Sequence, residues 1–412
     1  MRRFSSAALV LAVAASVLVG GSVAQADAIR DSQYWLDDFG IRDAWRTTQG
    51  EGVTIAIIDT GVDGRVSELQ GAVVGGTDFS GLGSSNGQRP VGSVGSEHGT
   101  MVAGLAVGRG TGGNNGVIGA APAASVLAIS IGFGEGGISS DDQIAQAVRW
   151  AVDNGADVIN MSLTRNTLDW PESWDDAFLY AQQNDVVVVA AAGNRGSGTT
   201  QVGAPATMPG VLTVAGVDAN GQASFDASSQ GITIGVAAAS EDLVGVVPGG
   251  GHVLWNGTSG ATPIVAGIVA LVRAAHPNLD AANVINRVVA TASDAGAAGP
   301  DPIYGFGLVN AAAAVGASVP IVEANPMGDL AEWITIYRRA DAAPSPLPTS
   351  APLPTAPPVA AGPDSPLGTL LPTVNQLRNV GIPLVVLAVF LALATTLVIM
   401  AVRRFRAPPP NL

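Results

Sequence analysis

The segment Asn256-Gly-Thr-Ser-Gly-Ala-Thr-Pro-Ile-Val-Ala-Gly267 places a serine between Gly-Thr and a run of small residues, and an apolar stretch of helical character continues to residue 275. Pro263 falls where a helix tolerates proline, in its first turn. We therefore expect Ser259 at the amino end of a helix, where unpaired backbone N–H groups face a bound group. That position suits a nucleophile whose reaction produces an oxyanion, although a serine there is more often only a helix cap.

The composition excludes several classes of function. The chain has 412 residues, of which 47% are hydrophobic, and its net charge is −14. This acidity argues against a protein that binds nucleic acid or an anionic membrane surface. Cysteine is absent, so disulfides, thiolate metal sites and a cysteine nucleophile are excluded. No Asp/Asn-rich loop has the ligand spacing of a calcium site, and we expect neither a metal nor a cofactor.

The first 26 residues have the pattern of a signal peptide. Arg2 and Arg3 precede an apolar run over residues 7–19, and Ala24-Gln-Ala26 follows as a small-residue cleavage site. An uncleaved membrane anchor is the alternative, but the apolar run is short for a span. Residues 27–50 then form a short extension of helical character.

From residue 53 onward, apolar β-branched segments alternate with amphipathic ones. This alternation predicts an α/β fold, with a parallel sheet between two layers of helices, in a domain that covers residues 27–318. Ser140 and Gln143 have the spacing of a capping box at the start of one helix. We expect strands at residues 53–58, 125–131, 158–161, 186–191 and 211–217, with further short strands between residue 217 and the Ser259 helix. We expect helices at 101–107, 140–154 and 172–184.

Two ionisable residues stand out as candidates for catalysis. Asp59 ends the first buried strand, where α/β folds place their sites. The chain has three histidines, of which His98, at the start of a helix, is the candidate base. We interpret His276 as structural and His252 as facing solvent. The glycine-rich segment 113–119 resembles a dinucleotide-binding fingerprint, but no strand leads into it and no helix follows, so we interpret it as a loop.

The composition changes after the domain. Residues 319–379 form a predicted linker in which proline is frequent, and its proline-rich part extends at most about 95 Å. Residues 380–402 contain no charged side chain and would span about 34 Å as a helix, enough to cross a lipid bilayer. Arginines in the tail, residues 403–412, place the C-terminus in the cytoplasm and the domain outside.

The candidate residues occur in the order Asp59, His98, Asn194 and Ser259. Their surroundings, Asp59-Thr-Gly-Val, His98-Gly-Thr, Ala-Gly-Asn194 and Gly-Thr-Ser259-x-Ala-x-Pro, resemble the motifs of subtilisin-like serine proteases across residues 52–315. The resemblance implies a subtilisin-like three-layer fold and a serine endopeptidase. It makes Ser259 the nucleophile, His98 the general base, Asp59 the residue that orients His98, and Asn194 an oxyanion donor.

The same resemblance implies that residues 132–136 and 161–164 flank an extended protein or peptide substrate, which adds as a strand. Thr164 stands where subtilisins commonly have glycine, and Gly260 stands where a larger apolar residue is usual. Thr164 adds bulk beside the primary specificity pocket. The candidate substrate-binding residues are Gly132, Gly134, Ser162, Leu163 and Thr164.

One subgroup of this family resembles a larger part of the chain. The segments Tyr34-Trp-Leu-Asp-Asp-Phe-Gly-Ile-Arg-Asp-Ala-Trp45 and Thr47-Thr-Gln-Gly50, the proline-rich stalk and the C-terminal span resemble the mycosins, membrane-anchored subtilases of type VII secretion. The extension before the first strand is too short for the folding pro-domain of secreted subtilisins. Two further functions stay open, a general protease that degrades envelope proteins and a mainly structural partner of the secretion machinery.

Overall fold

The computed structural model describes residues 28–135 and 137–338. The predicted signal peptide, the proline-rich segment and the predicted span at residues 380–402 lie outside this part of the chain. The chain divides into two units, residues 1–343 and 344–412, and all described residues belong to the first.

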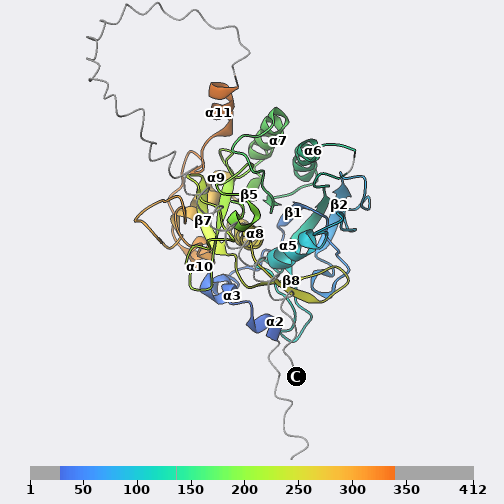
Figure 1. The fold of residues 1–412 in the computed structure, drawn as a ribbon. Coiled ribbons are helices and arrows are strands. Elements are labelled where there is room, and N and C mark those ends of the chain that lie inside the picture. The colour runs from blue at the N-terminus through green and yellow to red at the C-terminus, as the bar shows by residue number, and fades with distance from the viewer. Residues whose placement is uncertain (1–27, 136, 339–412) are drawn as a thin grey trace, which may run out of the picture. The chain divides into compact units, whose positions relative to one another are not determined.

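One parallel sheet forms the centre of the domain, and its strand order is β2-β3-β1-β4-β5-β6-β7 (Figure 1). The central strands are almost entirely apolar because helices cover both faces of the sheet. This arrangement confirms the predicted fold class and the five predicted strands, with ends that differ by one residue at most. The strands are β1 (Thr54–Asp59), β2 (Val73–Asp78), β3 (Ser125–Ser130), β4 (Val158–Met161), β5 (Val187–Ala191), β6 (Leu212–Val217) and β7 (Ile234–Ala239).

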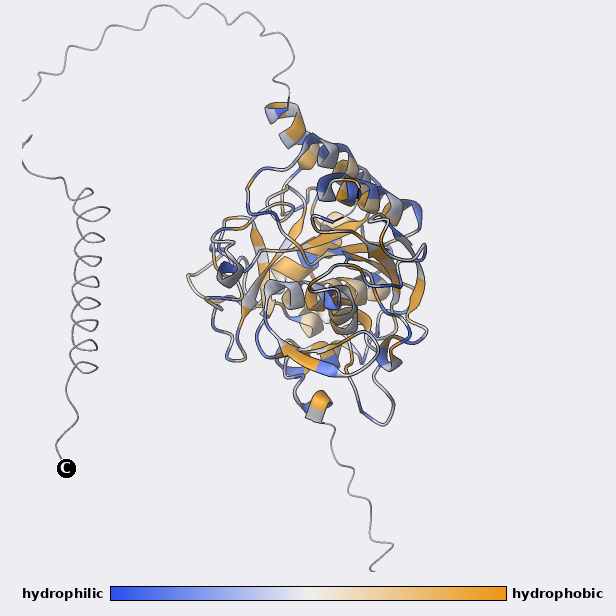
Figure 2. Ribbon diagram, turned by 45° about the vertical axis from the view of Figure 1, so that its right-hand side comes forward, coloured by the Kyte–Doolittle hydropathy of each residue, from blue (hydrophilic) through white to orange (hydrophobic). Residues whose placement is uncertain are grey.

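Two pairs of helices cover the sheet. Helices α5 (His98–Val107) and α8 (Thr258–Ala275) pack against each other on one face, and α6 (Ser140–Asp153) and α7 (Glu172–Gln183) pack together on the other. Figure 2 shows apolar strands in the middle of the domain and polar residues on the outer helices. The smaller elements are α2 (Ala28–Asp31), α3 (Trp35–Asp38), α4 (Ile41–Ala44), η1 (Ser67–Leu69), η2 (Arg195–Ser197), the antiparallel hairpin β8 (Leu243–Val246) and β9 (His252–Trp255), α9 (Ala281–Ala290), α10 (Ala311–Gly316) and α11 (Leu330–Tyr337).

Helix α8 is the one described helix that is long and apolar enough to cross a membrane. Most of it, 78%, is buried inside the domain, where it contacts β4, β5, β6 and β7. Its hydropathy therefore reflects its place in the core of the domain.

The cap of α6 differs from the predicted capping box. Ser139, not Ser140, is the N-cap, and its hydroxyl accepts a hydrogen bond from the backbone N–H of Asp142. The Ser140 hydroxyl instead donates to the carbonyl of Gly132 at 2.7 Å, and the Gln143 side chain donates to the carbonyl of Ile138. The capping-box prediction was wrong by one residue because Ser140 and Gln143 hold the preceding loop.

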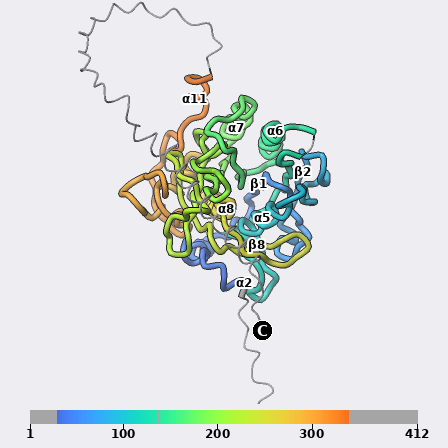
Figure 3. The backbone as a smooth tube through the Cα atoms, in the orientation of Figure 1, coloured from blue at the N-terminus to red at the C-terminus, as the bar shows by residue number. Residues whose placement is uncertain are grey.

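The N-terminal extension packs on the domain through buried aromatic and aliphatic side chains. Trp35 and Leu36 are fully buried, and the carbonyl of Phe39 accepts a hydrogen bond from the backbone N–H of Ala311 in α10. The Trp45 indole donates to the carbonyl of Ala120. The expected helical character of this extension is confirmed by α2, α3 and α4. Figure 3 shows α2 and α11 at opposite ends of the domain.

The chain continues to pack on the domain beyond Ser318, where composition places the start of the linker. The ring of Trp333 in α11 lies 4.4 Å from that of Trp170. Arg338 forms an ion pair with the buried carboxylate of Asp175 at 2.8 Å and donates to the carbonyl of Trp170. These long-range contacts attach α11 to the loop before α7 and to its first turn, which local composition does not reveal.

Replacement of Trp333 by alanine removes the ring contact that attaches α11. We expect the domain to lose about 1–3 kcal/mol of stability, which a thermal melt would show as a lower Tm. Ile336→Ala is the matched control on the same helix, because this side chain is 59% exposed. Equal melting temperatures for the two variants would contradict a stabilising role of the contact.

Candidate functional site

The side chains of Asp59 and His98 form a hydrogen-bonded pair. Asp59 ends β1 and is fully buried, while His98 begins α5 and is partly exposed. The Nδ1 atom of His98 lies 2.9 Å from both carboxylate oxygens of Asp59, and Oδ1 also accepts from the backbone N–H of Thr60 at 2.7 Å. A proton on Nδ1 leaves the Nε2 atom of the neutral ring free to accept a proton.

The loop after β1 and the first turn of α5 are joined by their threonines. The Thr60 hydroxyl accepts from the backbone N–H of Gly99 and donates to the carbonyl of Ser96. The Thr100 hydroxyl accepts from the backbone N–H of Asp63. These bonds hold α5 against the end of β1, which gives a physical reason for threonine in both motifs.

Ser259 lies in the first turn of α8, as the sequence predicts, but Pro263 lies one turn further in than expected. Helix α8 already begins at Thr258, so Pro263 occupies its second turn. Proline has no N–H, and the Ser259 carbonyl, four residues earlier, therefore lacks its helical partner. The Ser162 hydroxyl donates to that carbonyl at 2.9 Å.

The hydroxyl of Ser259 forms a second hydrogen bond between Ser259 and Ser162. Its Oγ donates to the carbonyl of Ser162 at 3.2 Å. Within residues 28–135 and 137–338, no hydrogen bond joins Oγ to His98. Hydrogen bonds of this kind are often long or absent without substrate and form in the complex.

Asn194 is oriented by the residue before Ser259. Its Oδ1 accepts from both the backbone N–H and the hydroxyl of Thr258, at 2.8 and 2.9 Å. Both partners are donors, so the amide oxygen faces Thr258 and the NH2 group is directed elsewhere. Neither this NH2 group nor the backbone N–H of Ser259 has a hydrogen-bond partner among the described residues. One of these donors belongs to Ser259 and the other to the side chain that is bonded to the preceding residue, and two such donors can together hold an oxyanion.

The pKa of His98 reflects opposing effects. Burial alone lowers the pKa of the imidazole, but the charge and the hydrogen bond of Asp59, together with the charge of Glu97, raise it above its ordinary value. The other histidines have different surroundings. The ring of His252, predicted to face solvent, lies 2.7 Å from the buried carboxylate of Glu68, and the ring of His276 lies 2.7 Å from the carbonyl of Val315.

The two expected edges of a peptide groove follow β3 and β4, which lie on either side of β1 in the sheet. Strands β3 and β4 are therefore two strand spacings apart, roughly 9.6 Å. One added strand fits between two segments at this separation. The backbone groups of Leu163 and Thr164 have no hydrogen-bond partner in the described part of the chain. On the other edge, Gly132 N–H donates to Gln143 and Gly134 N–H to Ser140, so these two N–H groups are already used.

An ion pair links the segments that directly follow these two edges. Arg165 follows Thr164, and its guanidinium lies 2.5 Å from the carboxylate of Asp141 in the first turn of α6. The hydroxyl of Thr164 donates to the carbonyl of Arg165 at 3.0 Å, which keeps this side chain within its own loop. Sequence reasoning missed Asp141 and Arg165 because nothing local links residues so far apart.

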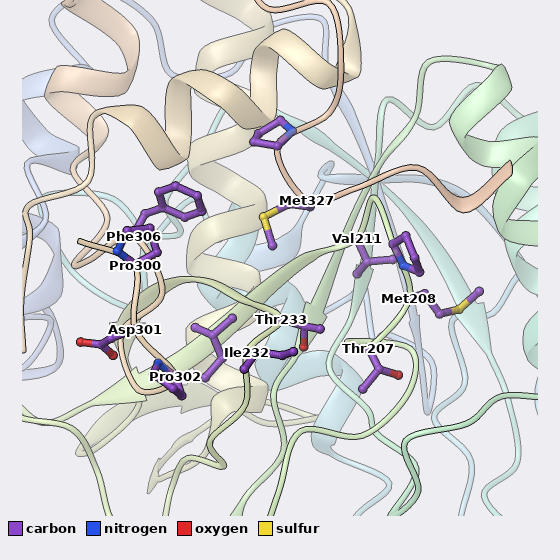
Figure 4. Close-up of a pocket in the computed structure, with 13 residues that line it drawn as sticks. Thr207, Met208, Val211, Ile232, Thr233, Pro300, Asp301, Pro302, Phe306 and Met327 are labelled. Carbon is purple, nitrogen blue, oxygen red and sulfur yellow. The ribbon is translucent and has the colours of Figure 1, made fainter. Parts of the chain in front are cut away.

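A separate cavity of about 410 Å³ contains none of these residues. Figure 4 shows its lining, which includes residues at the amino ends of β6 and β7, whereas Asp59 is at the carboxyl end of β1 in the same parallel sheet. Among the described residues, no cluster of histidine, aspartate and glutamate has the geometry to hold a metal ion. The lining residues are Thr207, Met208, Pro209, Val211, Ile232, Thr233, Ile234, Pro300, Asp301, Pro302, Phe306, Pro326 and Met327.

The sequence is similar to that of known proteases. The profile of the subtilase family matches residues 50–307. Subtilisin DY of Bacillus licheniformis is 37% identical over 271 residues, which cover 65% of this chain and 92% of that protein. Subtilisin E of Bacillus subtilis is 37% identical over 270 residues, which cover 64% of this chain and 66% of that protein.

The fold is similar to solved mycosin structures. MycP1 from Mycobacterium smegmatis matches with a TM-score of 0.60 and 31% identity, over 70% of this chain and 85% of that one. MycP3, a protease from the type VII (ESX-3) secretion system, matches with a TM-score of 0.60 and 31% identity, over 73% of this chain and 90% of that one.

The raised pKa of His98 predicts the pH dependence of the serine. The ring must be neutral to accept a proton, so reaction of Ser259 with a fluorophosphonate should increase with pH, with a midpoint above about 6.5. The charge of Glu97 contributes to the raised pKa, and Glu97→Gln should move the midpoint to lower pH without changing the plateau rate. An unchanged midpoint at low ionic strength would contradict this electrostatic account.

Proposed function

The chain belongs to the subtilase family of serine endopeptidases, and from this membership we propose that Asp59, His98 and Ser259 form its catalytic triad. The observation that carries the proposal is the hydrogen bond between buried Asp59 and His98 at the start of α5, together with a serine in the first turn of α8, the helix that packs against α5. Its substrates are proteins or peptides, and the proposed reaction requires no cofactor.

In the proposed mechanism, His98 Nε2 removes the proton from Ser259 Oγ as Oγ attacks the scissile carbonyl. The peptide C–N bond breaks when the resulting imidazolium gives that proton to the leaving amine. A water molecule, activated by the same nitrogen, then hydrolyses the acyl-enzyme. Asp59 holds the ring with its Nδ1 proton inward and stabilises the imidazolium.

The developing oxyanion is held by the Asn194 NH2 group and the Ser259 backbone N–H. Both donors are free in the described structure, and Thr258 already fixes the orientation of the amide. Donors that are oriented before the reaction need no rearrangement when the charge develops, which is why they lower the barrier.

The substrate backbone pairs with the edge at Leu163 and Thr164. These residues have unpaired backbone groups, so an extended peptide gains hydrogen bonds without displacing any. Ser162 lies at the start of this edge and contacts Ser259. Gly132 and Gly134 form the opposite wall. There a peptide would have to pair with backbone groups that are not already bonded to Ser140 or Gln143.

We further propose that the enzyme is anchored in the cell membrane, with the domain outside. The support is the charge-free segment 380–402, the arginines after it and the signal-peptide pattern at residues 1–26. A protease on a stalk of at most about 95 Å reaches only proteins at or crossing the same membrane. Similarity to MycP3 supports a link to type VII secretion.

Loss of the nucleophile tests the triad. Ser259→Ala should abolish peptide hydrolysis and labelling by a fluorophosphonate probe, while the thermal melt stays unchanged. Asn194→Ala should lower kcat by about 10²–10³, because it removes one oxyanion donor. Full activity of purified Ser259→Ala protein would exclude the proposed mechanism.

Comparison of the secreted proteomes of wild-type and Ser259→Ala cells tests the biological role. We expect a few longer protein species in the mutant, because a tethered enzyme with Thr164 beside its specificity pocket performs limited processing. Broad accumulation of unfolded envelope proteins would instead favour a general degradative protease. A secretion defect that is absent from Ser259→Ala cells but present in a deletion strain would favour the structural role.

A further inference from the structure

Trp255, the last residue of β9, contacts the ring of His98. The two ring centroids are 5.7 Å apart and the ring planes meet at 78°, an edge-to-face arrangement that aromatic pairs favour. Asp59 and Trp255 therefore contact the His98 ring through different interactions. Asp59 holds one nitrogen by a hydrogen bond, while Trp255 touches the ring by packing.

The hairpin that carries Trp255 is fixed at both ends of β9. His252, its first residue, contacts the buried carboxylate of Glu68. Asn256, directly after Trp255, accepts a hydrogen bond from the backbone N–H of Asp242 at 2.8 Å. The indole therefore belongs to a strand whose ends cannot shift freely.

Two glycines, Gly245 and Gly260, leave space for this indole. A Cβ atom at Gly245 would lie 2.9 Å from the indole nitrogen of Trp255. A Cβ atom at Gly260 would lie 2.2 Å from Leu243, which pairs with Trp255 across the hairpin, and 3.4 Å from the indole itself. Gly260, the residue after Ser259, is thus explained by the space that Leu243 and Trp255 occupy.

Packing, and not a hydrogen bond, holds the side chain of Trp255 in place. Its indole nitrogen is buried and has no hydrogen-bond partner among the described residues. A buried N–H without a partner is destabilising, and a phenylalanine would place a ring there without that cost. The contact of Trp255 with His98 is thus one of ring against ring, which a phenylalanine would reproduce in part.

We propose that Trp255 is a positioning residue for His98, which keeps the ring plane aligned so that Nε2 can reach Ser259 while Nδ1 stays on Asp59. This inference rests on the proposed triad. The imidazole gains a proton and loses it in both halves of the reaction, so a ring that tilts slows acylation and deacylation alike. The indole acts through His98 and need not touch the substrate.

The test uses the full-length protein and two substrates whose leaving groups carry no amino acid, a peptide p-nitroanilide and a peptide ester. Trp255→Ala should lower kcat on both by about 3–10-fold, with KM within about twofold of wild type. Trp255→Phe should restore part of the loss. The matched control is Leu254→Ala, on the opposite face of the same strand and 68% exposed, which should behave as wild type.

Active-site titration with a fluorophosphonate corrects each rate for the folded fraction. If Trp255→Ala does not fold, Trp255→Leu, which keeps apolar volume without a ring, carries the same expectation. Wild-type kcat in these variants would overturn the inference. So would a loss confined to KM, or to peptides with residues after the scissile bond, since the indole would then be a wall for the leaving segment. Activity in His98→Ala would instead overturn the triad itself.

Discussion

Burial of helix α8 is the constraint on which the rest of the structure depends. Its apolar residues contact α5 and the strands from β4 to β7, and burial of this much apolar surface is the main favourable term in folding. In its first turn, the backbone N–H groups of Thr258 and Gly260 donate to Asn194 Oδ1 and to the carbonyl of Gly257, while that of Ser259 has no partner among the described residues. The bonds to Asn194 hold this turn at the carboxyl ends of the strands, where Asp59 also lies. Packing of the core thus places Ser259 beside its proposed partners.

The sequence predicted those features that depend on residues close together in the chain. Strands that are buried on both faces read as continuous apolar runs, so β1, β3, β4, β5 and β6 could be predicted to within a residue, and their alternation with helices predicted a parallel sheet. The order of Asp59, His98, Asn194 and Ser259 identified the candidate site. The structure then brought Asp59 to His98, and Asn194 to the residue before Ser259.

What the sequence missed depends on contacts between distant residues. The attachment of α11 needs Trp333 to meet Trp170, and the Arg165–Asp141 ion pair needs the loop after β4 to meet α6. Short strands were expected between residue 217 and the Ser259 helix, but the bounds of β8 and β9 and their pairing were not, because the turn is glycine-rich and the second strand is exposed and lacks the pattern of a buried strand. Ser139 caps α6 because the Ser140 hydroxyl is bonded to the carbonyl of Gly132, and the spacing of residues in the sequence does not show that bond.

Ser162 connects the proposed peptide groove to the nucleophile. Pro263 removes the helical partner of the Ser259 carbonyl, the Ser162 hydroxyl replaces it, and the Ser162 carbonyl accepts from Ser259 Oγ. The Ser162 hydroxyl itself accepts from the side chain of Asn160 in β4. An extended peptide that pairs with Leu163 and Thr164 thus binds to the residues directly after the one that holds Oγ. In the proposed complex, one short segment therefore contacts both the substrate and Ser259, and Pro263 is the physical reason why the Ser259 carbonyl is open to the Ser162 hydroxyl.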